Sequence, residues 1–157
     1  MPKIVTTLWF DGRVQEAVDF YTSIFDNSRI KAISRYGDAG PGPKGEILTA
    51  DFLLEGQEFT ILNGGPGFPH SLAISLLIHC ETQAEVDAFW EKLSEGGEKG
   101  QCGWLTDRFG VSWQVVPTAL DRMLQDADEA RTQRVIKAML TMTKLDIAEL
   151  ERAYNDE

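Results

Sequence analysis

The side chains of this sequence best suited to metal binding or nucleophilic catalysis are two histidines and two cysteines: His70, His79, Cys80 and Cys102. The histidines lack the i, i+4 spacing that would place both on one helix face as a metal pair. There is no C-x-x-C motif, and two cysteines are too few for a disulfide framework or a cysteine-rich zinc site. We therefore expect free thiols and no metal site built from these residues.

Cys102 is the candidate catalytic residue, since a thiol can act as a nucleophile. A reactive thiol needs a neighbouring cation or base, and neither adjoins Cys102 in the sequence. The alternative is a packed, inert cysteine. His79 has two interpretations as well: it faces a binding site, or it lies at a strand end where backbone or water satisfies it.

A G-x-G-x-x-G spacing occurs at Gly40, Gly42 and Gly45. In dinucleotide-binding proteins this spacing follows a strand and opens a helix. Here prolines interrupt the glycines and a strand is predicted to follow them. We therefore predict a flexible loop and no nucleotide-like cofactor.

Composition and charge exclude several classes of partner. The hydrophobic and charged fractions, 43% and 25%, are typical of a soluble globular domain. A net charge of −10 without a local Lys/Arg cluster disfavours nucleic acid. No apolar run approaches the ~20 residues that span a bilayer, and the N-terminus lacks the apolar region of a secretory signal. We expect a cytoplasmic protein with no membrane partner.

The first part of the chain predicts the element order β-α-β-β-β. Strands are expected near residues 3–10, 29–36, 46–54 and 58–63. The helix has an apolar stripe at helical spacing, and Asp11 is its expected cap. The stripe comprises Val14, Ala17, Val18, Tyr21 and Phe25.

The same order recurs after a Gly/Pro loop at residues 64–69. Strands are expected near residues 72–80, 98–101, 102–107 and 111–117, and a capping box, Thr82 to Glu85, opens the helix. From Thr118 onward the pattern is helical and amphipathic. We predict an α+β domain at 1–117, made of modules at about 3–64 and 72–117. The helical extension at 118–157 is expected to pack on this domain, with a role in a dimer interface as the alternative.

Short motifs near both ends of residues 3–117 resemble a known superfamily. Asp107 to Pro117 is similar to the D-x-x-G-x-x-[hydrophobic]-E-[hydrophobic] ending of modules in the glyoxalase/bleomycin-resistance/dioxygenase (vicinal oxygen chelate) superfamily. Cys102-Gly103-Trp104-Leu105 extends the similarity to the C-G-W-x-x-D-x-x-G-x-x-W-Q block of its PhnB-like branch. Phe10-Asp11-Gly12, Glu16-Ala17 and Phe20-Tyr21 resemble the F-x-G-x-x-x-E-A-x-x-F-Y pattern of the same branch. Residues 138–150 are similar to an extension found in a subset of it.

The resemblance implies two βαβββ modules whose strands form a U-shaped mixed sheet, which cups a small ligand, and it implies a homodimer. Members are often labelled 3-demethylubiquinone-9 3-methyltransferases, a label that no cofactor motif in this sequence supports. Strand alternation assigns the side chains that face the cup. Those predicted to bind the ligand are Thr7, Trp9, Phe59, Asn63, Ser75, His79, Trp104 and Gln114. Those of the fifth strand predicted to face the helices are Leu72, Ile74, Leu76 and Ile78.

The metal positions implied by the resemblance fall, within one residue each, on Thr7, Asn63, Ser75 and Gln114. These neutral oxygens supply no charge to offset dehydration of a divalent cation, so no tightly bound metal is expected. We therefore predict a protein that binds a small organic molecule. One alternative is a lyase-, isomerase- or dioxygenase-like enzyme with a weak metal or a Cys102-based mechanism. Another is a structural dimerisation module that uses the C-terminal helices.

Overall fold

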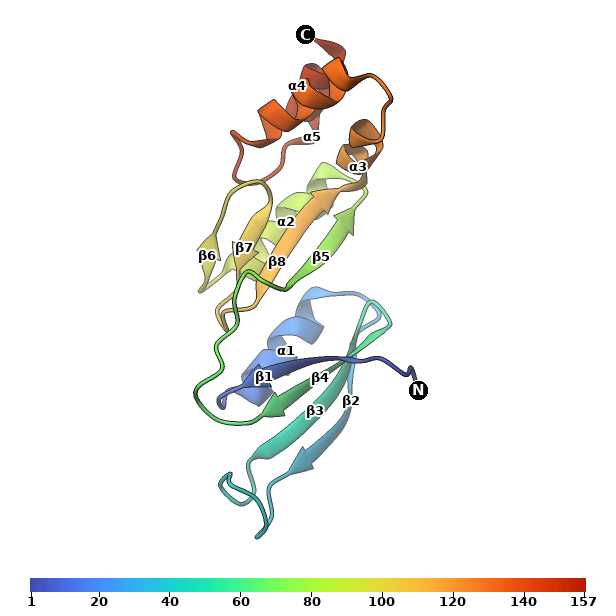
Figure 1. Cartoon of the computed structure of the whole chain (residues 1–157). Coiled ribbons are helices and arrows are strands. Elements are labelled where there is room, and N and C mark those ends of the chain that lie inside the picture. Colours follow the sequence, from blue (N-terminus) through green and yellow to red (C-terminus); the bar gives the residue numbers. More distant parts are fainter. The chain divides into compact units, whose positions relative to one another are not determined.

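The computed structural model describes all residues, 1–157, as two compact units, Met1–His70 and Ser71–Glu157. Each unit has a four-stranded mixed sheet with a helix on one face (Figure 1). The second unit also contains the C-terminal helices. None of the helices combines the length and apolarity needed to cross a membrane.

The first unit follows the predicted β-α-β-β-β order. Its elements are β1 (Thr6–Phe10), α1 (Val14–Ile24), β2 (Arg29–Arg35), β3 (Ile47–Leu54) and β4 (Gln57–Asn63). The strands are ordered β1-β4-β3-β2, with β1 and β4 parallel and the other pairs antiparallel. The apolar stripe of α1 packs on the sheet, where the ring of Tyr21 stacks on Phe52 with centroids 6.3 Å apart.

The start of α1 differs from the prediction. The residue before the helix is Arg13, in a left-handed conformation with φ of 57°, and no side chain caps the helix. The prediction that Asp11 caps α1 was therefore wrong, because the turn at Gly12 and Arg13 places two residues between Asp11 and the first helical residue. The predicted helix itself is present at the expected position.

The second unit repeats the element order. It comprises β5 (Ser75–Cys80), α2 (Gln83–Ser94), β6 (Glu98–Lys99), β7 (Trp104–Thr106) and β8 (Ser112–Pro117). The strand order is β5-β8-β7-β6, with β5 and β8 parallel. The Thr82 side chain accepts a hydrogen bond from the Glu85 backbone N–H and caps α2, as the sequence predicts.

A buried aspartate fixes the turn between β7 and β8. The carboxylate of Asp107 accepts hydrogen bonds from the backbone N–H groups of Phe109 and Val111 and from the indole N–H of Trp113. Gly110 has φ of 88°, which a residue with a side chain adopts at a cost. The D-x-x-G motif thus specifies a turn that feeds the last strand.

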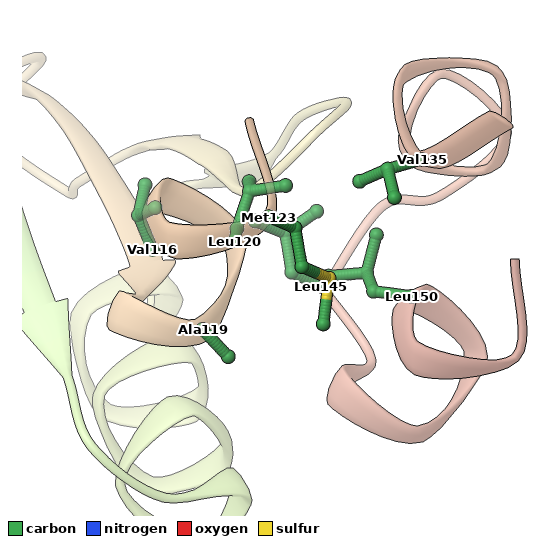
Figure 2. Close-up of a cluster of buried hydrophobic side chains, with 7 residues drawn as sticks. All are labelled: Val116, Ala119, Leu120, Met123, Val135, Leu145 and Leu150. Atoms are coloured by element: carbon green, nitrogen blue, oxygen red, sulfur yellow. The ribbon is translucent and has the colours of Figure 1, made fainter. Parts of the chain in front are cut away.

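The extension forms three further helices, α3 (Thr118–Leu124), α4 (Glu129–Met139) and α5 (Ile147–Asn155). Asp128 caps α4 and Asp146 caps α5 through their carboxylates. The apolar faces of these helices meet in a buried cluster at the end of β8 (Figure 2). Its members are Val116, Ala119, Leu120, Met123, Val135, Leu145 and Leu150. The extension therefore packs on the second module.

Strand β5 is shorter than predicted. It starts at Ser75, and the preceding Leu72 and Ile74 are 66% and 77% exposed. The prediction that these two side chains face the helices was wrong, because residues 71–74 lie outside the strand and have no strand alternation to orient them. Leu76 and Ile78 pair with the buried Trp113 and Val115 and do lie on the α2 side.

Candidate functional site

Strand register defines which residues share the face opposite α1 in the first unit. Leu8 pairs with Ile61 and is buried with it under the helix, so Thr7 and Trp9 lie on the opposite face. Thr60, which pairs with Thr7, also lies there and donates a hydrogen bond to the Asp51 carboxylate. The predicted orientation of Thr7 and Trp9 agrees with this register.

Phe59 lies on the other face, contrary to the prediction. It pairs with Phe52, and the two rings stack with centroids 5.7 Å apart. Phe52 in turn stacks on Tyr21 of α1. The prediction chose the wrong one of the two alternating sets of β4: residues 59, 61 and 63 are the buried set and face α1. Phe59 is therefore a core residue of the first unit.

Asn63 is also on the helix side, and both the oxygen and the nitrogen of its amide form hydrogen bonds with the backbone. Its Oδ1 accepts a hydrogen bond of 2.8 Å from the Gly12 N–H, and its Nδ2 donates one of 2.9 Å to the Ile47 carbonyl. The side chain is buried. The predicted cup-facing orientation of Asn63 was wrong, because this amide joins β4 to the turn before α1 and to β3.

Trp9 is half-buried by the loop that follows β4. Its indole N–H donates a 2.8 Å hydrogen bond to the Gly65 carbonyl, and its ring meets Phe68 edge-on at 5.0 Å. A side chain at Gly64 would overlap the indole, so the loop can approach only with glycine there. His70 Nε2 lies 2.8 Å from the Trp9 carbonyl oxygen. His70 is thus part of the packing around Trp9.

The G-x-G-x-x-G segment is the loop between β2 and β3, as predicted, and Tyr36 organises it. The Tyr36 backbone exchanges hydrogen bonds with Gly45 and Glu46, and its hydroxyl donates to the Asn63 carbonyl. Gly42 packs directly against the Tyr36 ring. A pocket of about 360 Å³ lies beside this loop and has Asp11 and Glu46 among its lining residues.

In the second unit, Ser75, His79, Trp104 and Gln114 lie on the face opposite α2. Gln114 pairs with Trp104 in β7 and lies between the buried Trp113 and Val115. The Gln114 amide donates a 2.9 Å hydrogen bond to the Ser75 hydroxyl. Two of the positions implied for metal ligands are therefore joined to each other by a neutral hydrogen bond.

His79 lies at the end of β5 next to the extension. Its Nε2 is 3.0 Å from a carboxylate oxygen of Asp121 in α3, and both side chains are exposed. Of the two predicted roles of His79, the structure agrees with the position at a strand end, but the partner is a carboxylate and not backbone or water. The contact ties the end of β5 to the helix that follows β8.

An apolar pocket of about 390 Å³ lies beside β6 and β7. Trp104 and Cys102, both predicted site residues, line it together with Leu72, Lys99 and Gln101. Sequence reasoning missed the last three as pocket residues. Leu72 was assigned to the helix face, Lys99 ends a strand of two residues, which is too short for an alternation pattern, and Gln101 lies in the turn between β6 and β7.

Cys102 and Cys80 have different environments. Cys102 is half-buried at the pocket and adopts a left-handed conformation with φ of 57°. Cys80 is buried, and desolvation, with a smaller contribution from the charge of Glu85, raises the pKa of its thiol to about 12. Cys80 therefore remains a neutral thiol at physiological pH.

The residues at the implied metal positions do not fit a divalent cation. Asn63 is buried and committed to backbone partners, and Ser75 and Gln114 bond to each other. The structure contains no group of three or more His, Cys, Asp or Glu side chains placed to hold a metal. Carboxylate or imidazole ligands, which such sites need, are missing from these positions.

Comparison with solved structures defines the class of fold. The fosfomycin resistance protein FosX from Listeria monocytogenes superimposes with a TM-score of 0.60 at 16% identity, over 80% of this chain and 98% of its own. Protein PA1353 from Pseudomonas aeruginosa gives 0.62 at 24% identity, over 74% and 98%. The predicted α+β architecture, the glyoxalase/bleomycin-resistance fold of the vicinal oxygen chelate superfamily, is confirmed.

Sequence comparison defines the family. The family model for 3-demethylubiquinone-9 3-methyltransferase matches residues 2–116, and the chain belongs to this family. A PhnB protein from Bacillus cereus, which bears the same description, is 41% identical over 74% of this chain and 99% of its own, with a TM-score of 0.69. The predicted PhnB-like membership is thus confirmed. A search of curated protein sequences finds no match.

Proposed function

We propose that this PhnB-like protein binds a small organic molecule, without a tightly bound catalytic metal, at the sheet of the second unit. The observation that carries the proposal is the Gln114–Ser75 hydrogen bond of 2.9 Å, which occupies two implied metal positions with neutral groups. Neutral donors and acceptors beside aromatic rings suit an organic ligand better than an ion.

The pocket beside β6 and β7 supports the proposal. Its volume of about 390 Å³ lies in the range of small-molecule sites, and its lining is mainly apolar. The charged residues of the lining are Glu98 and Lys99, and the Lys99 ammonium group is 3.1 Å from the Glu91 carboxylate, so its positive charge is balanced. We infer a ligand that is largely apolar or aromatic and carries few charges.

The enzyme alternative rests on Cys102, which lines the same pocket. A nucleophilic thiol needs a base within hydrogen-bond reach, and no histidine is among the residues that line the pocket. We therefore propose that Cys102 contributes to the pocket wall and does not act as a nucleophile. The homodimer and the cytoplasmic location stay predictions.

A fluorescent apolar probe tests the pocket. We expect 1-anilinonaphthalene-8-sulfonate to bind the full-length protein, and Trp104→Ala to weaken binding at least about tenfold, which corresponds to ~1.4 kcal/mol, because the largest ring of the pocket wall is removed. Leu140→Ala is the matched control, since Leu140 is an exposed apolar residue at the end of α4. Equal probe affinity in the wild type and Trp104→Ala would contradict the proposed pocket.

A further inference from the structure

The extension makes direct backbone contact with the turn that carries Cys102. The Cys102 N–H donates a 2.9 Å hydrogen bond to the Met142 carbonyl, and the Gly103 N–H donates one of 2.7 Å to the Thr143 carbonyl. Gln101 and Cys102 belong to the pocket wall. One short segment of the extension, residues 142–147, therefore contacts the turn that forms part of the pocket wall; we call it the anchor segment.

This turn has a conformation that needs support. Trp104 N–H donates to the Gln101 carbonyl, and the two central residues, Cys102 and Gly103, have φ of 57° and 84°. A left-handed conformation costs a residue with a side chain about 1–2 kcal/mol, so Cys102 adopts it only where hydrogen bonds or packing offset that cost. The carbonyls of Met142 and Thr143 supply such hydrogen bonds.

The anchor segment is itself fixed to α2. Gln83 donates a 3.0 Å hydrogen bond to the Leu145 carbonyl and accepts one of 2.8 Å from the Ile147 N–H. The Lys144 ammonium lies 2.9 Å from the Asp87 carboxylate. Gln83, Lys144 and Asp87 therefore hold the segment at both its middle and its end.

Packing leaves little freedom between the anchor segment and the turn. Leu145 is fully buried and lies among Met123 and Leu150 of the helical cluster (Figure 2). A Cβ at Gly103 would lie 3.0 Å from the Leu145 side chain and 2.8 Å from the Val115 carbonyl oxygen. The turn is thus enclosed between β8 and the anchor segment.

The extension lies beyond the part shared with the family. The family model ends at residue 116, and the PhnB protein from Bacillus cereus is covered over 99% of its length by 74% of this chain. The contacts with the Cys102 turn are therefore made by a segment outside the matched region.

We propose that the anchor segment positions the Cys102–Gly103 turn and thereby sets the shape of the apolar pocket. This inference rests on the proposed function for the role of the pocket, but the positioning of the turn stands on its own contacts. Gln83 and Lys144 are positioning residues: they act on the pocket through the anchor segment and line no part of it.

A double variant of the full-length protein, Gln83→Ala/Lys144→Ala, tests the proposal. It removes the contacts that hold the anchor segment and substitutes no residue of the pocket wall. The matched control is Gln133→Ala/Lys137→Ala, which removes the same residue types from the exposed side of α4. Lys144→Arg, which keeps the charge opposite Asp87, is expected to behave as the wild type.

Three measurements are made on each protein: hydrogen exchange at the Cys102 and Gly103 amides, the rate at which Ellman's reagent modifies Cys102, and the affinity for 1-anilinonaphthalene-8-sulfonate. We expect the double variant to show exchange about tenfold faster, faster thiol modification and at least about fivefold weaker probe binding. A melting temperature close to that of the control shows that the second unit stays folded.

Unchanged amide exchange at Cys102 and Gly103 in the double variant would overturn the proposal. Faster exchange with unchanged probe affinity would overturn it as well, because the turn would then not shape the pocket. If the wild type does not bind the probe at all, the proposed function fails, and the exchange and thiol rates still decide whether the anchor segment positions the turn.

Discussion

At the scale of residues, the two cysteines show how position determines the chemistry of a thiol. Cys80 is the last residue of β5 and is buried, and its raised pKa of about 12 follows chiefly from desolvation. Cys102 lines the pocket and is accessible in part. A thiol-modifying reagent added to the native protein is therefore expected to react with Cys102 and not with the buried Cys80.

Burial of Cys80 predicts a pH dependence of stability. Above its ordinary pKa of 9.0 the thiol ionises in the unfolded chain, whereas in the folded protein it keeps its proton until about pH 12. The folded state thus binds more protons in this window, so the free energy of unfolding falls as pH rises. Urea unfolding between pH 8 and 10.5 should show a decline steeper in the wild type than in Cys80→Ala, by at most about 1.4 kcal/mol per pH unit. Parallel declines would contradict this account.

Residue orientation could be predicted only where the phase of a strand was clear. In β8, the tryptophan and valine on either side of Gln114 fix the phase, and Ser75 and Gln114 face the predicted side. In β4, the more apolar alternating set, which contains Phe59 and Ile61, was assigned to the cup, whereas the stacking of Phe59 on Phe52 places it in the core on the α1 side. Cross-strand register and aromatic contacts of this kind are set by tertiary packing, not by local sequence.

At the scale of elements, Asp107 links a sequence motif to the shape of a turn. Its carboxylate accepts three N–H hydrogen bonds, from Phe109, Val111 and Trp113, and the residue is 3% exposed. The turn sets the start of β8, and β8 carries Gln114. Loss of the carboxylate would therefore disturb the strand on which the candidate site depends.

We predict that Asp107→Ala lowers the free energy of unfolding by about 2–5 kcal/mol, because it leaves three donors without their acceptor in a buried turn. Asp38→Ala is the control: the Asp38 side chain is 89% exposed and pairs only with the exposed Lys44, so about 0–1 kcal/mol is expected. Urea unfolding of both variants gives the comparison. A loss for Asp107→Ala no larger than that of the control would refute the structural role of the motif.

The order of elements was predictable because each has a local signal. The capping threonine of α2, the apolar stripe of α1 and the acidic caps of α4 and α5 each lie where the structure has a helix. The prediction that Asp11 caps α1 was wrong because a short turn precedes the helix and no side chain caps it. The pocket beside β6 and β7 was not predictable, because strands of two and three residues have too few positions for an alternation pattern.

At the scale of the whole molecule, the chain consists of two βαβββ units and an extension that belongs to the second unit. The fold is that of a superfamily, and the family membership covers residues 2–116. Fold alone does not determine activity. The residues at the implied metal positions, neutral and hydrogen-bonded within the protein, therefore decide the functional proposal.

The most direct test of that proposal is the metal content of the untagged protein. Plasma mass spectrometry would be applied before and after soaking in Mn²⁺, Fe²⁺, Co²⁺, Ni²⁺ and Zn²⁺, followed by dialysis. Because Thr7, Asn63, Ser75 and Gln114 offer no charged ligand, we predict substoichiometric metal that dialysis removes. About one equivalent per chain retained after dialysis would contradict the proposal and indicate metal-assisted chemistry.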